Sequence, residues 1–261
     1  MTPLLLLGAG RMGGALIQGW TRVGAFAPAD LIVRDPFLTP GAMDEGARLN
    51  PPDAVLAEAQ TVLLAVKPQI WREVAAEVTS LLHPDAVIVS IAAGVRSADI
   101  SAAFGGRRAA RVMPTTAVAI GKGAASIVAA DPEARARAHA LFDPVGVSVD
   151  IDDEALMDVT VAVSGSAPAY LYAFIEAIEA AGEAQGLPAA ASRALVRATL
   201  VGAAALLDAS AEDPADLRRQ VTSPGGTTEA ALKVLMGDHG LGPLAAEAVE
   251  AAVKRSKELG A

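Results

Sequence analysis

A run of small and hydroxyl-bearing residues near the end of the chain has the composition of an anion-binding turn. It reads Ser-Pro-Gly-Gly-Thr-Thr from Ser223 to Thr228 and comes directly before an apolar helical pattern. Ser223 and Pro224 suit the N-cap and the first position of that helix. Gly226 then takes the third position, where a glutamate often reaches back to the cap, so the amides of Gly226, Thr227 and Thr228 should be free for an external carboxylate. Taken alone, the run is more simply a helix cap with a tight packing turn, and the rest of the chain decides between the two.

A glycine motif at the other end of the chain predicts a dinucleotide site. Gly8, Gly10 and Gly13 have the spacing G-x-G-x-x-G, after the apolar run Leu4–Leu7 and at the start of a helical pattern. The first glycine allows the tight turn, the second lets pyrophosphate approach the backbone, and the third lets helix and strand pack closely. The motif alone is weak, but its place in a first βαβ unit favours a nucleotide site over a plain structural turn.

The end of the second predicted strand carries residues that select the cofactor. Asp35 is placed to bind the adenosine ribose diol of NAD, whereas Arg34 is placed to pair with the 2′-phosphate of NADP. Arg11 adds positive charge for either cofactor. Both cofactors stay open at this stage, with a preference for NADP; a solvated strand end without ligand is the alternative.

Two further strand ends carry small residues and a proline. One reads Ala65-Val66-Lys67-Pro68 and the other Ile91-Ala92-Ala93-Gly94. In a doubly wound sheet the carboxyl ends of the strands face the ligand crevice, so a cofactor is expected to lie against this backbone. Lys67 on its own is equally an ordinary solvated lysine.

The hydrophobic pattern divides the chain into an α/β half and an all-α half. Short apolar runs predict strands at Leu4–Leu7, Leu31–Arg34, Val62–Val66, Ala86–Ile91, Ala109–Met113, Gly123–Val128 and Val145–Ile151. Helical patterns lie between most of them, at Gly13–Trp20, Val55–Glu58, Trp71–Leu82 and Pro132–Phe142. This alternation predicts a Rossmann-like, mostly parallel sheet. Later helices are predicted at Ala155–Gln185, Pro188–Ala209, Pro214–Val221, Thr227–Met236 and Pro243–Leu259. We expect a dinucleotide-binding domain at 1–151 and a helical domain at 152–261.

The composition excludes several classes of function. A net charge of −9 argues against nucleic acid and anionic membranes as partners, and the absence of cysteine excludes disulfides, thiol catalysis and cysteine-rich metal sites. No metal site is expected. No transmembrane span is predicted either, since the apolar stretch around Arg197 is interrupted by that charge. The start of the chain lacks a secretory pattern, so we expect a soluble protein of the cytoplasm.

The helical half has few large side chains and many apolar helix faces. With 52% hydrophobic and only 3% aromatic residues, the chain offers little for a thick core among these helices. We expect them to pack against a partner chain, because faces this apolar do not stay in water. A tight monomeric bundle is the alternative.

The order of these motifs resembles the pyrroline-5-carboxylate reductase family along essentially the whole chain. The resemblance rests on GAGRMG, AVKP, SIAAG, VMPTTA, VSGSAPAY and above all VTSPGGTTEAAL. It implies reduction of 1-pyrroline-5-carboxylate to proline with NADPH or NADH, the last step of proline synthesis. It also implies a Rossmann-like domain followed by a helical dimerisation domain, with homodimers assembled into rings.

The resemblance also implies which residues bind. Cofactor contacts would come from Leu7, Gly8, Ala9, Gly10, Arg11, Met12, Ala65, Val66, Lys67, Pro68, Ile91, Ala92, Ala93 and Gln220, the last in place of a family Asn. Substrate contacts would come from Glu154, Ser223, Gly226, Thr227 and Thr228. The chain departs from the family pattern at Thr115, Ala117 and Ala167, and an expected Asn is replaced near Pro52-Asp53.

The chemistry is consistent with the motifs. A cyclic imine must receive hydride at carbon from a nicotinamide about 3–3.5 Å away, and a proton at nitrogen. Thr228 is the candidate catalytic residue, as a hydroxyl that orients the imine nitrogen; no histidine or lysine stands out as a general acid. A β-hydroxyacid-type dehydrogenase is disfavoured because no lysine occurs between Asp150 and Thr222. A nucleotide-sensing protein without turnover is disfavoured because it needs no second anion site.

Overall fold

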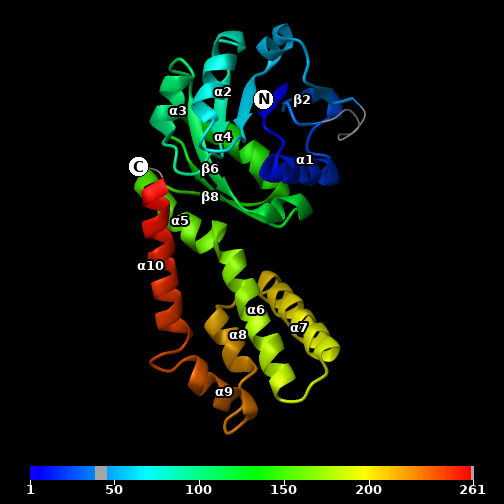
Figure 1. Ribbon diagram of the computed structural model, residues 1–261, viewed down its shortest axis with the longest axis vertical. Coiled ribbons are helices and arrows are strands. Elements are labelled where there is room, and N and C mark those ends of the chain that lie inside the picture. The colour runs from blue at the N-terminus through cyan, green and yellow to red at the C-terminus, as the bar shows by residue number, and fades with distance from the viewer. Residues whose placement is uncertain (39–45, 260–261) are drawn as a thin grey trace. The chain divides into compact units, whose positions relative to one another are not determined.

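The computed structural model describes residues 1–38 and 46–259, which form two compact units (Figure 1). Unit 1 contains Met1–Gly165 together with Val253–Ala261, and unit 2 contains Ser166–Ala252. The chain therefore leaves unit 1, builds unit 2 and returns. This division by contacts falls after Gly165, and the functional boundary at 151/152 stays a prediction.

Unit 1 is built on an eight-stranded sheet with the order β3-β2-β1-β4-β5-β6-β7-β8. The strands are β1 Leu4–Leu7, β2 Leu31–Arg34, β3 Arg48–Leu49, β4 Thr61–Leu64, β5 Val87–Ser90, β6 Ala109–Pro114, β7 Gly123–Val128 and β8 Gly146–Asp150. All neighbours pair in parallel except β6 and β7. Because the chain order reverses between β1 and β4, the crevice for a ligand is expected at their carboxyl ends.

The central strands β1, β4 and β5 are buried on both faces, as the continuous apolar runs predict. Leu4 and Leu6 belong to one hydrophobic cluster, and Leu5 and Leu7 belong to a second cluster. Neighbouring strands and the flanking helices supply most of the remainder. The helices of unit 1 are α1 Arg11–Val23, α2 Trp71–Val78, α3 Ser97–Ala103, α4 Pro132–Phe142 and α5 Met157–Thr160. Of these, α1 and α4 contribute to the first cluster and α2 and α3 to the second, whereas Met157 of α5 belongs to a third, small cluster.

The α/β architecture and the seven predicted strands are confirmed: three have the predicted bounds, and the other four differ by one or two residues at an end. The two-residue strand β3 and the short helix α3 were not predicted, because neither has a periodic apolar stretch long enough to signal its type. The predicted helix at Val55–Glu58 is wrong, since Asp53–Glu58 forms a 3₁₀ helix. The predicted helix from Ala155 to Gln185 is also interrupted, by a π-helical segment at Val161–Gly165.

Unit 2 consists of α6 Ala167–Ala184, α7 Ala189–Ala209, α8 Pro214–Gln220, α9 Thr227–Leu235 and the first part of α10 Leu241–Leu259. In the described residues, α6 has no buried residue and α7 has only Ser192. The expectation that no stretch reaches transmembrane length was wrong. Glu154–Ala184 and Ala189–Ala209 are both long and apolar enough to cross a membrane by length and composition. Arg197 does not prevent this because alanine and leucine dominate the rest of its helix, and its Nε pairs with Glu179 Oε1 at 2.8 Å.

Candidate active site

The glycine turn between β1 and α1 has the geometry of a phosphate cradle. Gly8 has a φ of +93°, and a Cβ at Gly13 would lie 2.2 Å from the Gly8 carbonyl oxygen, so neither position accepts a side chain. A Cβ at Gly10 would meet no atom within 4 Å, which leaves the space beside the turn open. The amides of Arg11 and Met12, the first two of α1, have no acceptor in the described part of the chain. Free donors, the helix dipole and open space together fit the pyrophosphate of a dinucleotide.

Asp35, directly after β2, directs its carboxylate into this turn. Its Oδ2 accepts the N–H of Ala9 at 2.7 Å, and its Oδ1 accepts the N–H of Phe37 at 2.8 Å. The N–H of Gly8 donates to the carbonyl of Arg34 at 2.9 Å. Asp35 is only 8% exposed, and each of its carboxylate oxygens accepts a hydrogen bond from the backbone. Asp35 therefore holds the backbone of the glycine turn between β1 and α1, called the cofactor turn below, in its observed shape.

The ends of β4 and β5 lie at the same edge of the sheet. A Cβ at Gly8 would lie 2.9 Å from Val66 Cγ1, and the N–H of Ile91 donates to the carbonyl of Leu64 at 3.0 Å. The N–H of Ala92 donates to Ser90 Oγ at 3.2 Å, and Lys67 is exposed. The structure thus brings together the cofactor residues predicted between Leu7 and Ala93, at the edge that contains the β1–β4 switch point.

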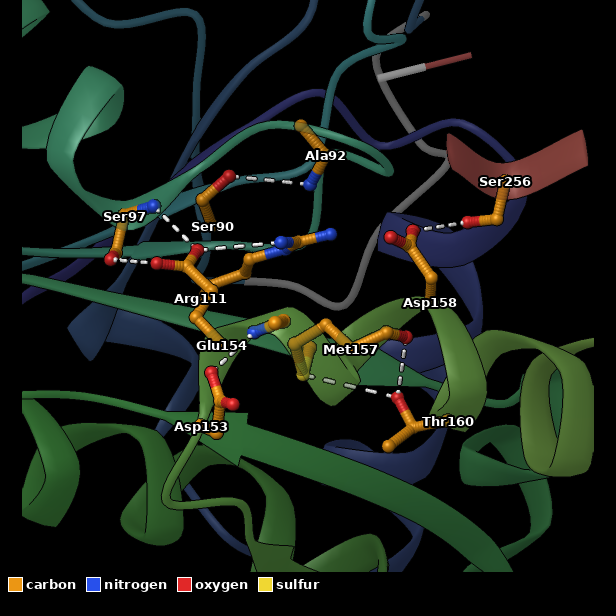
Figure 2. Close-up of polar contacts among 11 residues, drawn as sticks. Ser90, Ala92, Ser97, Arg111, Asp153, Glu154, Met157, Asp158, Thr160 and Ser256 are labelled. Carbon is orange, nitrogen blue, oxygen red and sulfur yellow. Dashed lines mark hydrogen bonds and ion pairs between the residues drawn. The ribbon is translucent and has the colours of Figure 1, made fainter. Parts of the chain in front are cut away.

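Glu154 belongs to a polar cluster within unit 1. Figure 2 shows its carboxylate between Ser97 and the Arg111 guanidinium. Its oxygens accept the Ser97 N–H at 2.8 Å and the Ser97 hydroxyl at 2.7 Å, and Arg111 Nη1 lies 3.3 Å from Oε1. The Arg111 side chain is only 6% exposed, so Glu154 balances a buried cation. Ser97 and Arg111 were not predicted, because no sequence signal links residues this far apart. The cluster also lies beside a cavity of about 590 Å³ that Arg96 and Lys257 line.

The predicted substrate segment forms a turn at the start of α9, with a geometry that differs from the expectation. The helix begins at Thr227 with Gly226 as its N-cap, so Ser223 is not the cap. The N–H of Gly226 is not free, because it donates to the carbonyl of Ser223 at 3.1 Å. An internal carboxylate is also present, since Glu229 Oε2 accepts the N–H of Gly225 at 2.5 Å. The helix start predicted at Thr227 is right, but the N-cap was placed three residues early, so the bond from Gly225 to Glu229 was not foreseen.

Fewer hydrogen-bonding groups of this turn are free than the sequence predicts. The amides of Thr227 and Thr228 and both hydroxyls have no partner in the ranges that the structure describes. Thr227 is exposed and Thr228 is half-buried. Gly226 is close-packed, since a Cβ there would lie 2.6 Å from Ser223 Oγ. The turn therefore offers two amides and two hydroxyls to an anion.

Two other residues that the sequence singles out, Gln220 and Thr115, make hydrogen bonds within the chain. Gln220, at the end of α8, donates from Nε2 to Glu212 Oε2 at 2.5 Å. Thr115, which departs from the family pattern, accepts the N–H of Ala124 at 3.0 Å through its hydroxyl and so fastens β6 to β7. Ala117 lies in the 3₁₀ helix Thr116–Ile120, and Ala167 is the first residue of α6. Among the described residues, no group of three or more His, Asp or Glu side chains is arranged to hold a metal ion.

Comparison with known proteins identifies the family. Residues 154–259 match the model of the pyrroline-5-carboxylate reductase dimerisation domain, and residues 4–94 match that of the NADP oxidoreductase, coenzyme F420-dependent domain. A pyrroline-5-carboxylate reductase of Pseudomonas aeruginosa is 38% identical over 99% of this chain and 97% of its own length. The chain belongs to the pyrroline-5-carboxylate reductase family. The enzyme of that name from Synechocystis is 37% identical over 98% of this chain and 97% of its own length.

Solved structures of the pyrroline-5-carboxylate reductase family have the same fold. The structure from Coxiella burnetii aligns with a TM-score of 0.91 at 30% identity, covering 100% of this chain and 99% of its own. The one from Plasmodium falciparum, with NADP bound, aligns at 0.84 with 26% identity, covering 100% and 98%. The Rossmann-like domain and the helical dimerisation domain predicted from the sequence are therefore confirmed for this member of the family.

Proposed function

We propose that this chain reduces 1-pyrroline-5-carboxylate to L-proline with NADPH or NADH, as the final step of proline synthesis. The observation that carries the proposal is the open turn at Thr227 and Thr228, in a family whose relatives are reductases of this imine. A protein that only senses a nucleotide would need the glycine turn of unit 1 but not this second anion site.

The cofactor turn is the proposed binding site for the dinucleotide. Arg11 and Met12 donate their amides to the pyrophosphate, Gly10 leaves room for it, and Gly8 and Gly13 keep α1 close to β1. The residues after β4 and β5, from Ala65 to Pro68 and from Ile91 to Ala93, line the path of the cofactor along the edge of the sheet. When bound, the reduced nicotinamide supplies the hydride.

The substrate turn is the proposed binding site for the imine. The amides of Thr227 and Thr228 bind the carboxylate, supported by the dipole of α9. The Thr228 hydroxyl, half-buried and without an internal partner, orients the imine nitrogen. Ser223 and Gly226 support this turn, since the Ser223 carbonyl accepts the Gly226 N–H.

Glu154 and Gln220 have a supporting role in this proposal. Glu154 is occupied by Ser97 and Arg111, so it acts by positioning the segment after β5 rather than by gripping a substrate that is itself an anion. Gln220 reaches the cofactor only if it leaves Glu212. Water is the proposed source of the proton, because an iminium is already electrophilic.

Spectrophotometry of the purified chain tests this function. NADPH or NADH absorbance should fall only when pyrroline-5-carboxylate is present, and proline should accumulate in equal amount. As a matched control, 1-pyrroline has the same ring without the carboxylate and should show a much higher KM. Failure of both cofactors to reduce the imine would reject the function. An equal KM for the two imines would reject the carboxylate site.

The chain is also proposed to work in the cytoplasm as a homodimer that assembles into a ring. The helices of the dimerisation domain support a dimer, because α6 and α7 present Phe174, Ile178 and Leu195 at their surface around a hollow of about 370 Å³. A second copy would cover these side chains. Light scattering of the purified protein gives the number of subunits.

A further inference from the structure

Two opposite charges meet at the position that reads the adenosine ribose in a Rossmann fold. Arg34 is the last residue of β2, and its Nη1 lies 2.8 Å from Asp53 Oδ1 and 3.5 Å from the carbonyl of Pro51. Both side chains remain accessible, at 38% exposure for Arg34 and 59% for Asp53. An exposed ion pair of this kind contributes little to the free energy of unfolding, so it can be broken or removed by mutation without unfolding the domain.

Asp35 already has internal partners and is mostly withdrawn from solvent. Both of its oxygens accept backbone N–H groups, from Ala9 and Phe37, and the residue is buried. Releasing the carboxylate would leave the partly buried Ala9 N–H of the glycine turn without its acceptor, at a cost in free energy. The choice between a ribose diol and a 2′-phosphate therefore falls to the two accessible charges, Arg34 and Asp53.

The position of Asp53 beside Arg34 is fixed by Asn50. Asn50 has a φ of +45°, and its side chain makes two bonds to Asp35: the Asp35 N–H donates to Oδ1 at 2.9 Å, and Nδ2 donates to the Asp35 carbonyl at 2.8 Å. Its own N–H donates to the carbonyl of Val33 at 2.8 Å. The segment that leads to Asp53 is thus held against the end of β2, and the carboxylate stays close to the guanidinium.

We propose that Asp53 is a specificity-determining residue that opposes the 2′-phosphate of NADPH. Arg34 attracts that phosphate, as arginine does at this position of the fold. Asp53 pairs with Arg34 and would add a negative charge beside a phosphate that Arg34 bound. NADH lacks the phosphate and meets no such opposition. This inference rests on the proposed function only in taking a nicotinamide dinucleotide as the ligand.

Binding of NADP⁺ and NAD⁺ to Asp53→Asn, measured by calorimetry without any imine, tests the proposal. Removing one negative charge near a phosphate should tighten NADP⁺ by at least about fivefold, the Coulomb effect of unit charges about 4 Å apart in water. NAD⁺ affinity should change less than about twofold. Asp53→Ala should give the same gain, Asp53→Glu should give none, and Arg34→Gln should weaken NADP⁺ selectively.

A matched control comes from a second ion pair on the neighbouring elements. Arg48 of β3 pairs with Glu58, at the end of the 3₁₀ helix Asp53–Glu58. Glu58→Gln should leave the ratio of the two affinities unchanged. An unchanged ratio in Asp53→Asn, or an equal loss for both cofactors, would overturn the proposal. Because no imine is used, the result stands apart from whether the chain reduces pyrroline-5-carboxylate.

Discussion

The two units of this chain bury their apolar side chains to very different degrees. In unit 1, Phe104 and Phe142 are 0% and 1% exposed and belong to clusters that cover both faces of the sheet. In unit 2, Tyr172 and Leu206 are 64% and 67% exposed. Unit 1 therefore has its own core, whereas the helices of unit 2 need a surface from elsewhere to cover them, in keeping with a dimerisation domain.

The largest effect is expected from a cavity in the core of unit 1. Phe142→Ala removes a buried ring at the end of α4 and should lower the free energy of unfolding by about 3–5 kcal/mol. Denaturant unfolding followed by fluorescence measures this. Phe37→Ala is the control, since that ring is 91% exposed and its loss should change stability by less than about 0.5 kcal/mol. Equal effects of the two would contradict the assignment of the core.

A charge on the apolar face of unit 2 should break the assembly and spare unit 1. Leu195→Asp places a carboxylate beside Phe174 and Ile178, where a partner chain would have to desolvate it. Light scattering should show dissociation to monomers, while NADP⁺ binding to unit 1 persists. Val23→Asp, at an exposed apolar position of α1, should leave the assembly intact. If the Leu195→Asp protein has the same assembly mass as wild type, this face is not part of the subunit interface.

Variants in the two binding turns should separate substrate from cofactor. Thr228→Ala removes one hydroxyl that we propose contacts the imine, and it should lower kcat/KM for the imine by about 10- to 100-fold, the range for one hydrogen bond to a charged group. The KM for NADPH should stay within about twofold. Gly10→Val should show the reverse, because its side chain fills the open space of the cofactor turn. If Thr228→Ala has wild-type kinetics, Thr228 does not contact the imine.

The smallest effect concerns a pH-dependent contact at the edge of the sheet. His139 lies between Asp143 and Asp150, at 3.0 and 3.3 Å. Burial lowers its pKa, but the hydrogen bonds and charges of the two aspartates outweigh this and raise the pKa above its ordinary value of 6.5. Protonation is therefore favoured in the folded state, so this stabilisation is full below pH 6.5 and is lost as pH rises through the raised pKa. The difference in Tm between wild type and His139→Gln should therefore shrink as the pH rises through the pKa of His139. A difference that stays constant with pH would contradict the stabilising contact.

The sequence predicts regular elements and single motifs well, and contacts between distant segments poorly. The G-x-G-x-x-G turn and the β1–β4 edge are local consequences of glycine spacing and apolar runs. The Arg34–Asp53 pair, the Asn50 bonds to Asp35 and the Glu154–Ser97 contact depend on tertiary packing, which no periodicity signals. The helix start at Thr227 was predicted correctly, but Ser223 was misassigned as its N-cap because Ser-Pro is a common helix start, and here the backbone turns once more before the helix begins.

The return of α10 to unit 1 also bears on synthesis of the protein. Val253 and the residues after it belong to unit 1, and the Ser256 hydroxyl donates to Asp158 Oδ1 at 2.6 Å. On the ribosome, most of the cofactor domain emerges first and can begin to fold, as N-terminal segments generally do. Its last contacts form only after the whole of unit 2 has been translated. The nascent cofactor domain can therefore complete its contacts only once α10 has been made, after the segment that forms unit 2.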